Sequence, residues 1–361
     1  MSIGRGLRRR QTSPRLRGVA VALVPTLVAV ACAGAETTGT GGGTTYEVGV
    51  DGSTDEFHGS FHRFFPRSLT VQPGDTVVFR RPENGEPHTV TLGNGVPTSD
   101  PIPGGHFFEG GFGGPPRRSA SMPCFLSSGL PPIEGCSPAE QEPMAFDGTQ
   151  SWFNSGGLLG EDEFTLELAD DIAPGTYTFV CLVHAFTMKG TIEVVGPEQP
   201  ADDPEDVVAR GSEELDRQVA LMLPLVERPP SGVEGRVEAA RFEGGGFAAW
   251  ANSFFPEEIE IPVGGTVTWI ISHIHTISFN ASESARPFYE EAEDGSVREN
   301  ELGAEPSGDP SGWDGSGFLN SGLRAGLSPP DEFSVTFTDP GTYAYRCLVH
   351  FDMEGRVNVG G

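Results

Sequence analysis

Two short segments of this chain carry the same three metal-binding residue types, in the same order. In each segment a Pro-Gly turn and an alternating stretch, typical of a strand, precede a cysteine, a histidine and a methionine. A thiolate, an imidazole and a thioether form a soft donor set, which suits copper better than zinc, calcium or magnesium. The residues are Cys181, His184 and Met188 within 174–190, and Cys347, His350 and Met353 within 340–355.

A further histidine completes each set. His88 follows Pro87 at the start of a β-rich stretch, and His275 stands at the matching place in the second half of the chain. Two imidazoles and a thiolate with a weak axial thioether are the donors of a blue-copper electron-transfer site. The sequence therefore predicts two type 1 copper ions. The predicted ligands are His88, Cys181, His184 and Met188 for one ion, and His275, Cys347, His350 and Met353 for the other.

The segments that must position these donors also recur in order, which indicates an internal repeat over nearly the whole of both halves. A complete donor set that occurs twice at matched positions is hard to explain by core packing alone. The matching pairs are 64–66 with 254–256, 69–79 with 259–269, 152–156 with 318–322, and 164–168 with 333–337.

We therefore divide the chain into five parts, two of which are all-β domains. The parts are an export signal at 1–31, a flexible tether at 32–45, a first domain at 46–196 with a long insertion at 93–160, an acidic linker with a short helix at 197–235, and a second domain at 236–361. Ser212 is the expected cap of the linker helix, whose apolar side ends before Pro224 and is expected to pack between the domains.

The N-terminal segment predicts export from the cytoplasm. Arginines precede the apolar run 18–31, which Pro25 interrupts and which is too short to span a bilayer comfortably. Small residues stand just before Cys32, an arrangement that resembles a bacterial lipoprotein signal, in which the cysteine is lipidated. Ala29 departs from that pattern, so ordinary cleavage and full secretion is the alternative. We expect a protein at the cell surface or in the periplasm, attached to the membrane only through a lipid on Cys32.

The net charge bears on the class of partner, and the two remaining cysteines bear on the stability of the fold. Beyond residue 31 there are 17 basic and 51 acidic residues, a formal charge of −34, which argues against nucleic acid as a partner. Cys124 and Cys136 form a local pair, for which a disulfide is expected to stabilise the fold by about 2–3 kcal/mol. A metal site using both thiols is less favoured because no histidine with suitable spacing accompanies them.

With these residues in place, both halves resemble the plastocyanin/azurin family of cupredoxins. The Cys-x2-His-x2-Met spacing at Cys347 is close to the amicyanin pattern, whereas the first half has one residue more before Met188. The resemblance implies an eight-stranded Greek-key sandwich in each half, with the exposed edges of His184 and His350 as electron ports. Family members often have Asn after the first histidine, where this chain has Thr89 and Thr276.

Three functions follow from this donor chemistry. The first is a non-enzymatic electron carrier that exchanges electrons with redox partner proteins. The second is an oxidase or reductase similar to two-domain copper nitrite reductases and small laccases, which need a further copper and have a histidine beside the type 1 cysteine. Here the neighbours are Val180 and Leu182, and Arg346 and Leu348. The third is copper storage or delivery, which predicts looser sites.

Four histidines stand outside the two donor sets. His58 and His62 would share one face if their segment were helical, and His273-x-His275 resembles the paired histidines of multicopper oxidases. No further Cys-His partner accompanies either pair, so we expect structural roles for them. The four are His58, His62, His106 and His273.

Overall fold

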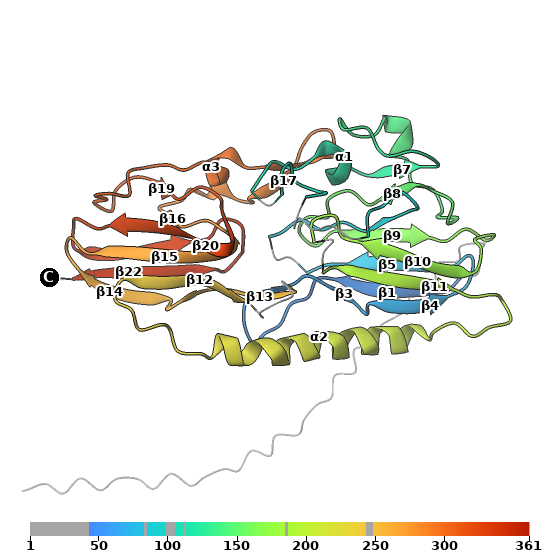
Figure 1. Ribbon diagram of the computed structural model, residues 1–361, viewed down its shortest axis with the longest axis horizontal. Coiled ribbons are helices and arrows are strands. Elements are labelled where there is room, and N and C mark those ends of the chain that lie inside the picture. Colours follow the sequence, from blue (N-terminus) through green and yellow to red (C-terminus); the bar gives the residue numbers. More distant parts are fainter. Residues whose placement is uncertain are drawn as a thin grey trace, which may run out of the picture. The chain divides into compact units, whose positions relative to one another are not determined.

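A computed structural model describes residues 43–82, 85–98, 105–111, 113–184, 187–242 and 248–360, without the side chains of 327–329. The expected export signal, Cys32 and most of the expected tether lie outside these residues. Strands make up most of the regular structure (Figure 1), so the prediction of an all-β fold class is confirmed.

In the first half, alternating apolar residues build one sheet around strand β1. Tyr46, Val48 and Val50 are buried on one face of β1, while the residues between them are more exposed. Strand β1 pairs in parallel with β5 and antiparallel with β3. The order is β3 (Phe64–Phe65), β1 (Thr45–Val50), β5 (Thr76–Arg80) and β9 (Glu163–Glu167).

A second sheet of the first half leads into the cysteine-bearing loop. Strand β10 ends at Val180, immediately before Cys181, and β11 begins at Lys189, immediately after Met188. The order is β4 (Ser68–Val71), β11 (Lys189–Val194), β10 (Gly175–Val180), β6 (Thr91–Leu92), β8 (Trp152–Asn154) and β7 (Cys124–Leu126).

The second half has the same order of corresponding strands in both of its sheets. One sheet contains β13 (Ala249–Phe255), β12 (Arg236–Phe242), β15 (Thr266–His275) and β20 (Arg324–Thr336). The other contains β14 (Glu258–Pro262), β22 (Glu354–Gly360), β21 (Gly341–Arg346), β16 (Ser278–Phe279) and β19 (Leu319–Asn320).

Aromatic side chains fill the space between the two sheets of each half. In the first half, the ring of Phe179 lies 4.7 Å from that of Phe64 on the opposite sheet. In the second half, the ring of Tyr345 lies 4.7 Å from that of Phe254. Each of these buried rings removes a large apolar area from water, and the edge-on arrangement of Phe64 and Phe179 is a favoured one. The same face-to-face packing therefore supports both donor sets.

One strand of the first half joins a sheet of the second half. Strand β2 (Gly59–Phe61) belongs to the first half by sequence, yet it pairs antiparallel with β13, joining Ser60 to Trp250. It thus forms the edge of a second-half sheet. Residues 41–361 are a single unit by their contacts. The segment around β2 therefore adds an edge strand to that sheet. It also brings the residues next to β2 in the chain to the junction of the halves.

The linker helix differs from the prediction. Helix α2 spans Pro204–Val226, 23 residues, and is not short. Its cap is Asp203, whose side chain accepts a hydrogen bond from the N–H of Glu205, with Pro204 at the first helical position. Ser212 lies inside the helix and donates to the carbonyl of Val208. Among the described residues, no helix is long and apolar enough to cross a membrane.

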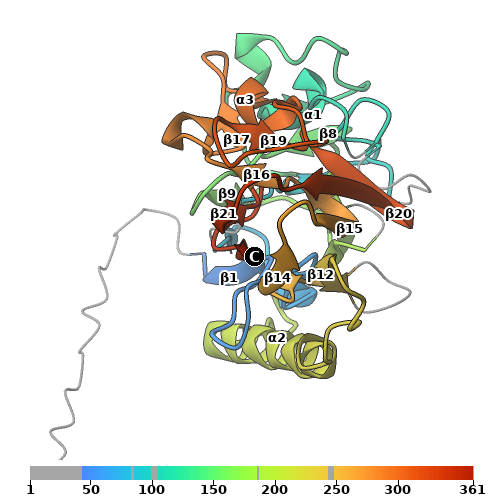
Figure 2. The ribbon, with the colours of Figure 1, turned by 90° about the vertical axis from the view of Figure 1, so that its left-hand side faces the viewer.

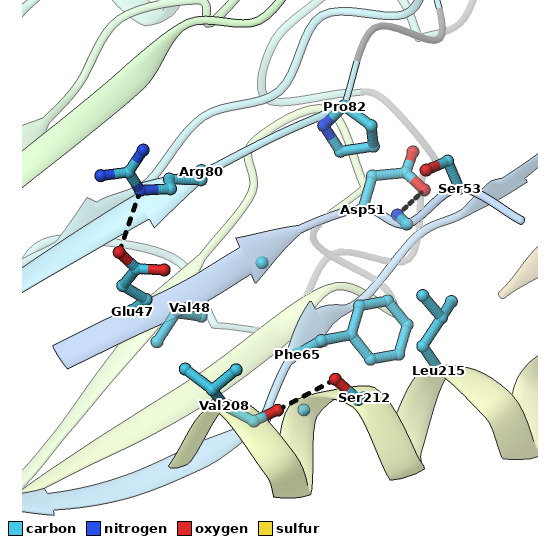
Figure 3. A pocket seen from close by; sticks show the side chains of 13 residues that line it. Glu47, Val48, Asp51, Ser53, Phe65, Arg80, Pro82, Val208, Ser212 and Leu215 are labelled. Atoms are coloured by element: carbon cyan, nitrogen blue, oxygen red, sulfur yellow. Dashed lines mark hydrogen bonds and ion pairs between the residues drawn. The ribbon is translucent and has the colours of Figure 1, made fainter. Parts of the chain in front are cut away.

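Helix α2 packs against both halves, as expected. It contacts β1 and β3 of the first half and β12 and β13 of the second, and Figures 1 and 2 show it running along this side of the sheets. Gly211 allows the close approach, since a Cβ there would lie 2.9 Å from the backbone of Phe65. Figure 3 shows the pocket between the helix and β1, which Leu215 and Phe65 line and which extends to Asp51.

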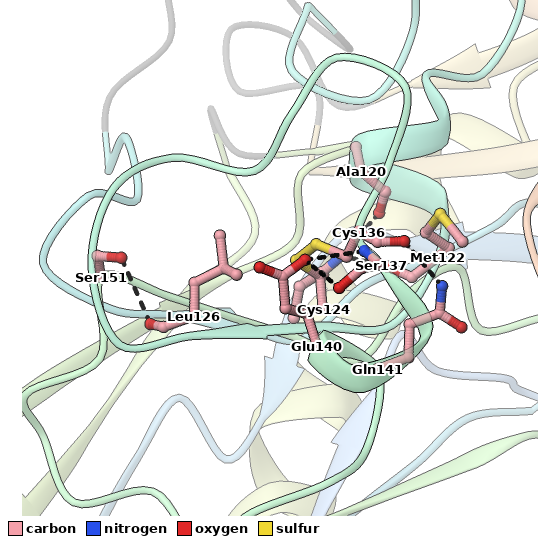
Figure 4. The surroundings of a disulfide bond; sticks show 10 residues. Ala120, Met122, Cys124, Leu126, Cys136, Ser137, Glu140, Gln141 and Ser151 are labelled. Carbon is pink, nitrogen blue, oxygen red and sulfur yellow. Dashed lines mark hydrogen bonds between the residues drawn. A yellow bond between two sulfur atoms is a disulfide. The ribbon is translucent and has the colours of Figure 1, made fainter.

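The insertion of the first half contains regular structure and a disulfide. Cys124, the first residue of β7, is joined to Cys136, with their Cα atoms 5.7 Å apart (Figure 4). Short elements here are α1 (Arg118–Ser121) and η1 (Pro138–Glu140). The corresponding region of the second half contains η2 (Glu283–Ala285), β17 (Tyr289–Glu291), β18 (Val297–Glu299) and α3 (Glu301–Ala304).

Candidate metal centres

The first donor set comes together in the interior of the first half. The Sγ atom of Cys181 lies 3.8 Å from Nδ1 of His88 and 3.7 Å from Nδ1 of His184. The Met188 side chain is fully buried, and its backbone is fixed by hydrogen bonds to Cys181 and His184. The loop after β10 thus holds three predicted donors close together. The fourth, His88, lies just before β6, the strand that pairs with β10 in the same sheet.

The second donor set has nearly the same geometry. Sγ of Cys347 lies 3.7 Å from Nδ1 of His275 and 3.7 Å from Nδ1 of His350. The carbonyl of Met353 accepts a hydrogen bond from the N–H of Cys347, as the carbonyl of Met188 does from Cys181. Met353 is also fully buried. The shorter loop before Met353 leaves this hydrogen bond in place.

These separations fit a metal ion in each set. A nitrogen about 2.0 Å and a sulfur about 2.3 Å from one ion, about 120° apart, lie about 3.7 Å from each other. That is the sulfur-to-nitrogen distance at both centres. In each set, the two histidine nitrogens and the cysteine sulfur lie within 4.8 Å of one another, so one soft metal ion could contact all three.

The threonine after the first histidine bonds to the cysteine loop at both centres. The N–H of Thr89 points at Sγ of Cys181 at 3.4 Å, and its hydroxyl accepts the N–H of Leu182 at 2.8 Å. Thr276 makes the same two contacts, with Cys347 at 3.5 Å and Leu348 at 2.8 Å. Threonine therefore joins the strand to the cysteine loop at the position where the family often has asparagine.

The repeated Asn-Ser-Gly motif fixes the strand that carries the first histidine. Ser155 accepts the N–H of Val90 at 2.9 Å, and Ser321 accepts that of Ile277 at 2.8 Å. The asparagine of the motif accepts a hydrogen bond from a hydroxyl group on the same strand, as Asn154 does from Thr91. The sequence shows this repeat clearly, but only the structure gives its role in supporting the donor sets.

A buried carboxylate backs His88, and sequence reasoning missed it. Oδ2 of Asp51 lies 3.0 Å from Nε2 of His88, and both side chains are completely buried. Burial alone would raise the pKa of Asp51, but its hydrogen bond with His88 and the histidine's charge hold this pKa below its usual value. Asp51 leaves Nδ1 of His88 to face Cys181, as a carboxylate behind a metal-binding histidine does.

In the described part of the second half, no carboxylate takes the corresponding position. In the strand register Val48 pairs with Phe79 and Val237 with Trp269, so Ala240 matches Asp51 three residues further on. Both have left-handed backbones, with φ of 65° at Asp51 and 66° at Ala240. Among the residues that the structure describes, Nε2 of His275 has no hydrogen-bond partner.

Glu86 joins the two donor sets. Its Oε2 lies 3.1 Å from Nε2 of His184, and its Oε1 lies 2.8 Å from Nε2 of His350. Exposed histidine edges were expected, and this expectation is wrong, because His184 is 4% and His350 1% exposed. Glu86 lies between the two histidines, and the ring of His62 stacks on that of His184.

Electrostatics keep Glu86 ionised in the interior. Burial would raise its pKa, but His273, His62 and the hydrogen bonds of His184 and His350 hold this pKa well below its usual value. Burial lowers the pKa of His184 to about 3. Burial also opposes protonation of His350, yet its hydrogen bonds to Cys347 and Glu86 raise its pKa to about 9.

Two histidines outside the predicted donor sets also face Glu86. Nε2 of His62 lies 3.5 Å from Oε2 of Glu86, and Nδ1 of His273 lies 3.9 Å from Oε1. The helical arrangement considered for His58 and His62 is wrong, because strand β2 separates them and His58 is exposed. His106 lies elsewhere, in the insertion.

Comparison with known proteins gives similarities of fold among solved structures. No protein-family model and no curated protein matches the chain. A purple cupredoxin from Nitrosopumilus maritimus is 24% identical, over 35% of this chain and 100% of its own, with a TM-score of 0.21. Auracyanin A, described as a blue copper protein from Chloroflexus aurantiacus, is 20% identical, over 43% and 100%, with a TM-score of 0.25.

A further solved structure is similar over more of the chain. The copper-containing nitrite reductase from Thermus scotoductus is 15% identical over 88% of this chain and 68% of its own, with a TM-score of 0.21. Because these TM-scores are low, the structural similarities do not identify a metal for this chain. Only the residue types of the donor sets indicate which metal they suit.

Proposed function

We propose that this chain is an exported electron-transfer protein with two cupredoxin-like domains, each of which holds one type 1 copper ion. When bound, copper supplies a one-electron couple between its cupric and cuprous states. The trigonal sulfur and nitrogen donors, found twice with matching separations, support this assignment. Buried donors fixed by backbone hydrogen bonds keep the two oxidation states similar in geometry, which favours fast electron transfer.

The observation that carries the proposal is the hydrogen-bonded chain from His184 through Glu86 to His350. Each imidazole turns Nδ1 toward its own cysteine and donates from Nε2 to the same carboxylate. Two hydrogen bonds and one carboxylate therefore connect the donor sets through the protein interior. We propose that electrons pass between the two centres along this path, within one chain.

Electrons must also be exchanged with a partner, and a surface pocket suggests where. His350, Phe351 and Asp352 border a pocket whose other side includes Phe57 and His58. We propose that a redox partner protein docks here, because this pocket reaches a histidine of the second donor set. The strongly acidic composition would attract basic partners. In this proposal the protein works outside the cytoplasm, attached through a lipid on Cys32.

The decisive experiment measures copper per chain in the purified protein, together with its optical and paramagnetic-resonance spectra. We expect two coppers, an intense copper–thiolate band near about 600 nm and no type 2 signal. One copper per chain, or a protein without the thiolate band, would contradict the proposal.

A copper enzyme is the second candidate, favoured by the group formed by His62, Glu86 and His273 beside the two donor sets. Against it, neither type 1 cysteine has a neighbouring histidine in the sequence. Steady-state assays with nitrite and with oxygen separate the two functions. A third copper together with turnover of either substrate would replace the carrier with an enzyme. Copper storage would instead give weak colour and easily removed copper.

A further inference from the structure

We propose that His62, Glu86 and His273 form a third metal site, which binds a redox-inert divalent transition-metal ion such as Zn(II) between the two type 1 centres. Imidazole nitrogens with a carboxylate oxygen suit ions of this class. The proposal goes beyond electron transfer, because it assigns a ligand to residues that neither donor set uses.

The positions of the donor atoms suit a shared ion. His62, Glu86, His184 and His273 each offer a ligand atom, and these atoms lie within 4.8 Å of one another. His184 already belongs to the first donor set, which leaves the other three. Two ligands about 2.1 Å from a tetrahedral ion lie about 3.4 Å apart. The 3.5 Å between His62 and Glu86 matches this value, and the 3.9 Å between His273 and Glu86 requires only a small closure.

The three donors come from both halves and are deeply buried. His62 and His273 are each 2% exposed, and Glu86 is fully buried. His62 follows β2, the strand that crosses to the second half, while His273 lies in β15. Burying two imidazoles and a carboxylate in one place is costly unless they are hydrogen bonded or coordinate a metal. The junction of the halves thus holds a buried cluster of polar side chains.

Matched positions in the two halves meet at this site. Glu86 and His273 each stand two residues before the first histidine of their donor set, and His62 and Asn252 each stand two residues before a Phe-Phe-Pro sequence. Asn252 is buried as well and donates to Ser60 at 2.8 Å. Three of these four positions carry residues that can bind a metal. The second half alone could not form the site.

The backbone at His273 departs from regular strand geometry. Its φ is 69°, and the register of β15 against β20 shifts between Ile271 and His273. Bulges of this kind redirect side chains, and left-handed non-glycine residues cluster at functional sites. The indole of Trp250 stacks on the His273 ring at 4.3 Å, and the His62 ring stacks on that of His184 at 3.8 Å. Both imidazoles are therefore held in fixed orientations.

Zn(II) is a suitable probe because it is redox-inert and leaves the blue bands visible. In the copper-loaded protein, dialysed against chelator and titrated with Zn(II), we expect one additional ion per chain and unchanged blue absorbance. Because a cation near Glu86 disfavours the cupric state, both blue centres should become easier to reduce once Zn(II) is bound. Absence of a third ion under these conditions would overturn the proposal.

Two variants test the ligands. His62→Gln removes one imidazole, and His273→Asn removes the other while keeping a residue that tolerates the left-handed backbone. Each should weaken Zn(II) binding at least about tenfold and retain both blue bands. His58→Gln, at an exposed histidine, is the matched control and should bind as the original chain does. Equal binding by all three would place the ion on the acidic surface and refute the site.

If a variant loses its blue bands, zinc-edge X-ray absorption of the original chain decides. The proposal requires two imidazoles around zinc, and ligation by oxygen alone would refute it. This measurement does not depend on copper, so failure of the third site can be distinguished from failure of the proposed electron-transfer function.

Discussion

The two donor sets are alike where they face the proposed copper and different behind it. The distances from the cysteine sulfur to the imidazole nitrogens agree to within 0.1 Å. Behind the first histidine, however, His88 has Asp51, while Ala240 takes the matching position beside the strand of His275. A carboxylate behind a ligand favours the more highly charged ion. We therefore expect the first centre to have the lower potential, so electrons flow from it to the second.

The connection between the centres is also asymmetric. Glu86 comes from the first half alone, and the matching residue of the second half is His273, two residues before His275. One carboxylate therefore serves both His184 and His350. Two facing carboxylates in the same buried space would repel each other. Because only the first half has a carboxylate at this position, a single negative charge connects His184 with His350.

Loss of either cysteine is expected to have the largest effect. Cys181→Ser should remove one blue centre and leave the other, and Cys347→Ser should do the converse, because each thiolate belongs to one donor set. Copper analysis and the absorbance near about 600 nm check this, with one copper remaining in each variant. Loss of both centres in either variant would show that the donor sets are not independent.

Replacement of the shared carboxylate should affect transfer between the centres more than the centres themselves. Glu86→Gln should retain both blue bands and slow intramolecular electron transfer by about tenfold or more, because the amide can accept only one of the two N–H groups through its oxygen. Pulse radiolysis followed at both bands measures this rate. Glu47→Gln, at an exposed glutamate, is the control. An unchanged rate in Glu86→Gln would exclude the proposed path.

The carboxylate behind His88 gives a test of the predicted order of potentials. Asp51→Asn should raise the potential of the first centre by about 60–120 mV, which corresponds to a 10–100-fold loss of preference for the cupric ion. The reciprocal variant Ala240→Asp should lower the potential of the second centre. Spectroelectrochemical titration of the Cys347→Ser and Cys181→Ser backgrounds isolates each couple. A fall in potential in Asp51→Asn would reverse the proposed direction of flow.

The disulfide should matter least for the metal centres. Replacing both Cys124 and Cys136 by Ala should lower the free energy of unfolding by about 3 kcal/mol, because a short loop is no longer closed in the unfolded chain. Denaturant titration measures this loss. Both blue bands should be unchanged, since the bond lies in the insertion. Loss of the first blue band alone would show that the insertion also positions the first donor set.

The sequence predicts the donor sets and most strands because both depend on local pattern. Alternation marks β1, β5 and β10, and repetition separates Cys181 and Cys347 from ordinary core cysteines. Asp51 and Glu86 could not be found in this way. Asp51 reaches His88 through sheet register, and Glu86 gains its role only from the second half. The resemblance to single-domain proteins likewise predicted exposed edges for His184 and His350, which are buried here beside Glu86.

The helix error has a local cause. A run of apolar residues after Ser212 suggested a start there, although Asp203, Pro204 and Glu205 already provide a cap, a first-turn proline and a first-turn acid. The segment between these two places includes Val207 and Val208, and only the packing of the helix shows that Val207 is buried while Val208 is exposed.

Strand β2 determines what a shortened version of this protein could be. A fragment beginning at Arg236 would keep all four donors of the second set, yet β13 would lose its neighbour and present an unpaired edge to solvent. His350 would lose Glu86 and become open to water. Such a fragment is expected to associate through that edge, whereas a chain cut only in the linker would stay together as a non-covalent complex. The two halves are therefore expected to form one stable unit, held together through β2 and the contact of His350 with Glu86.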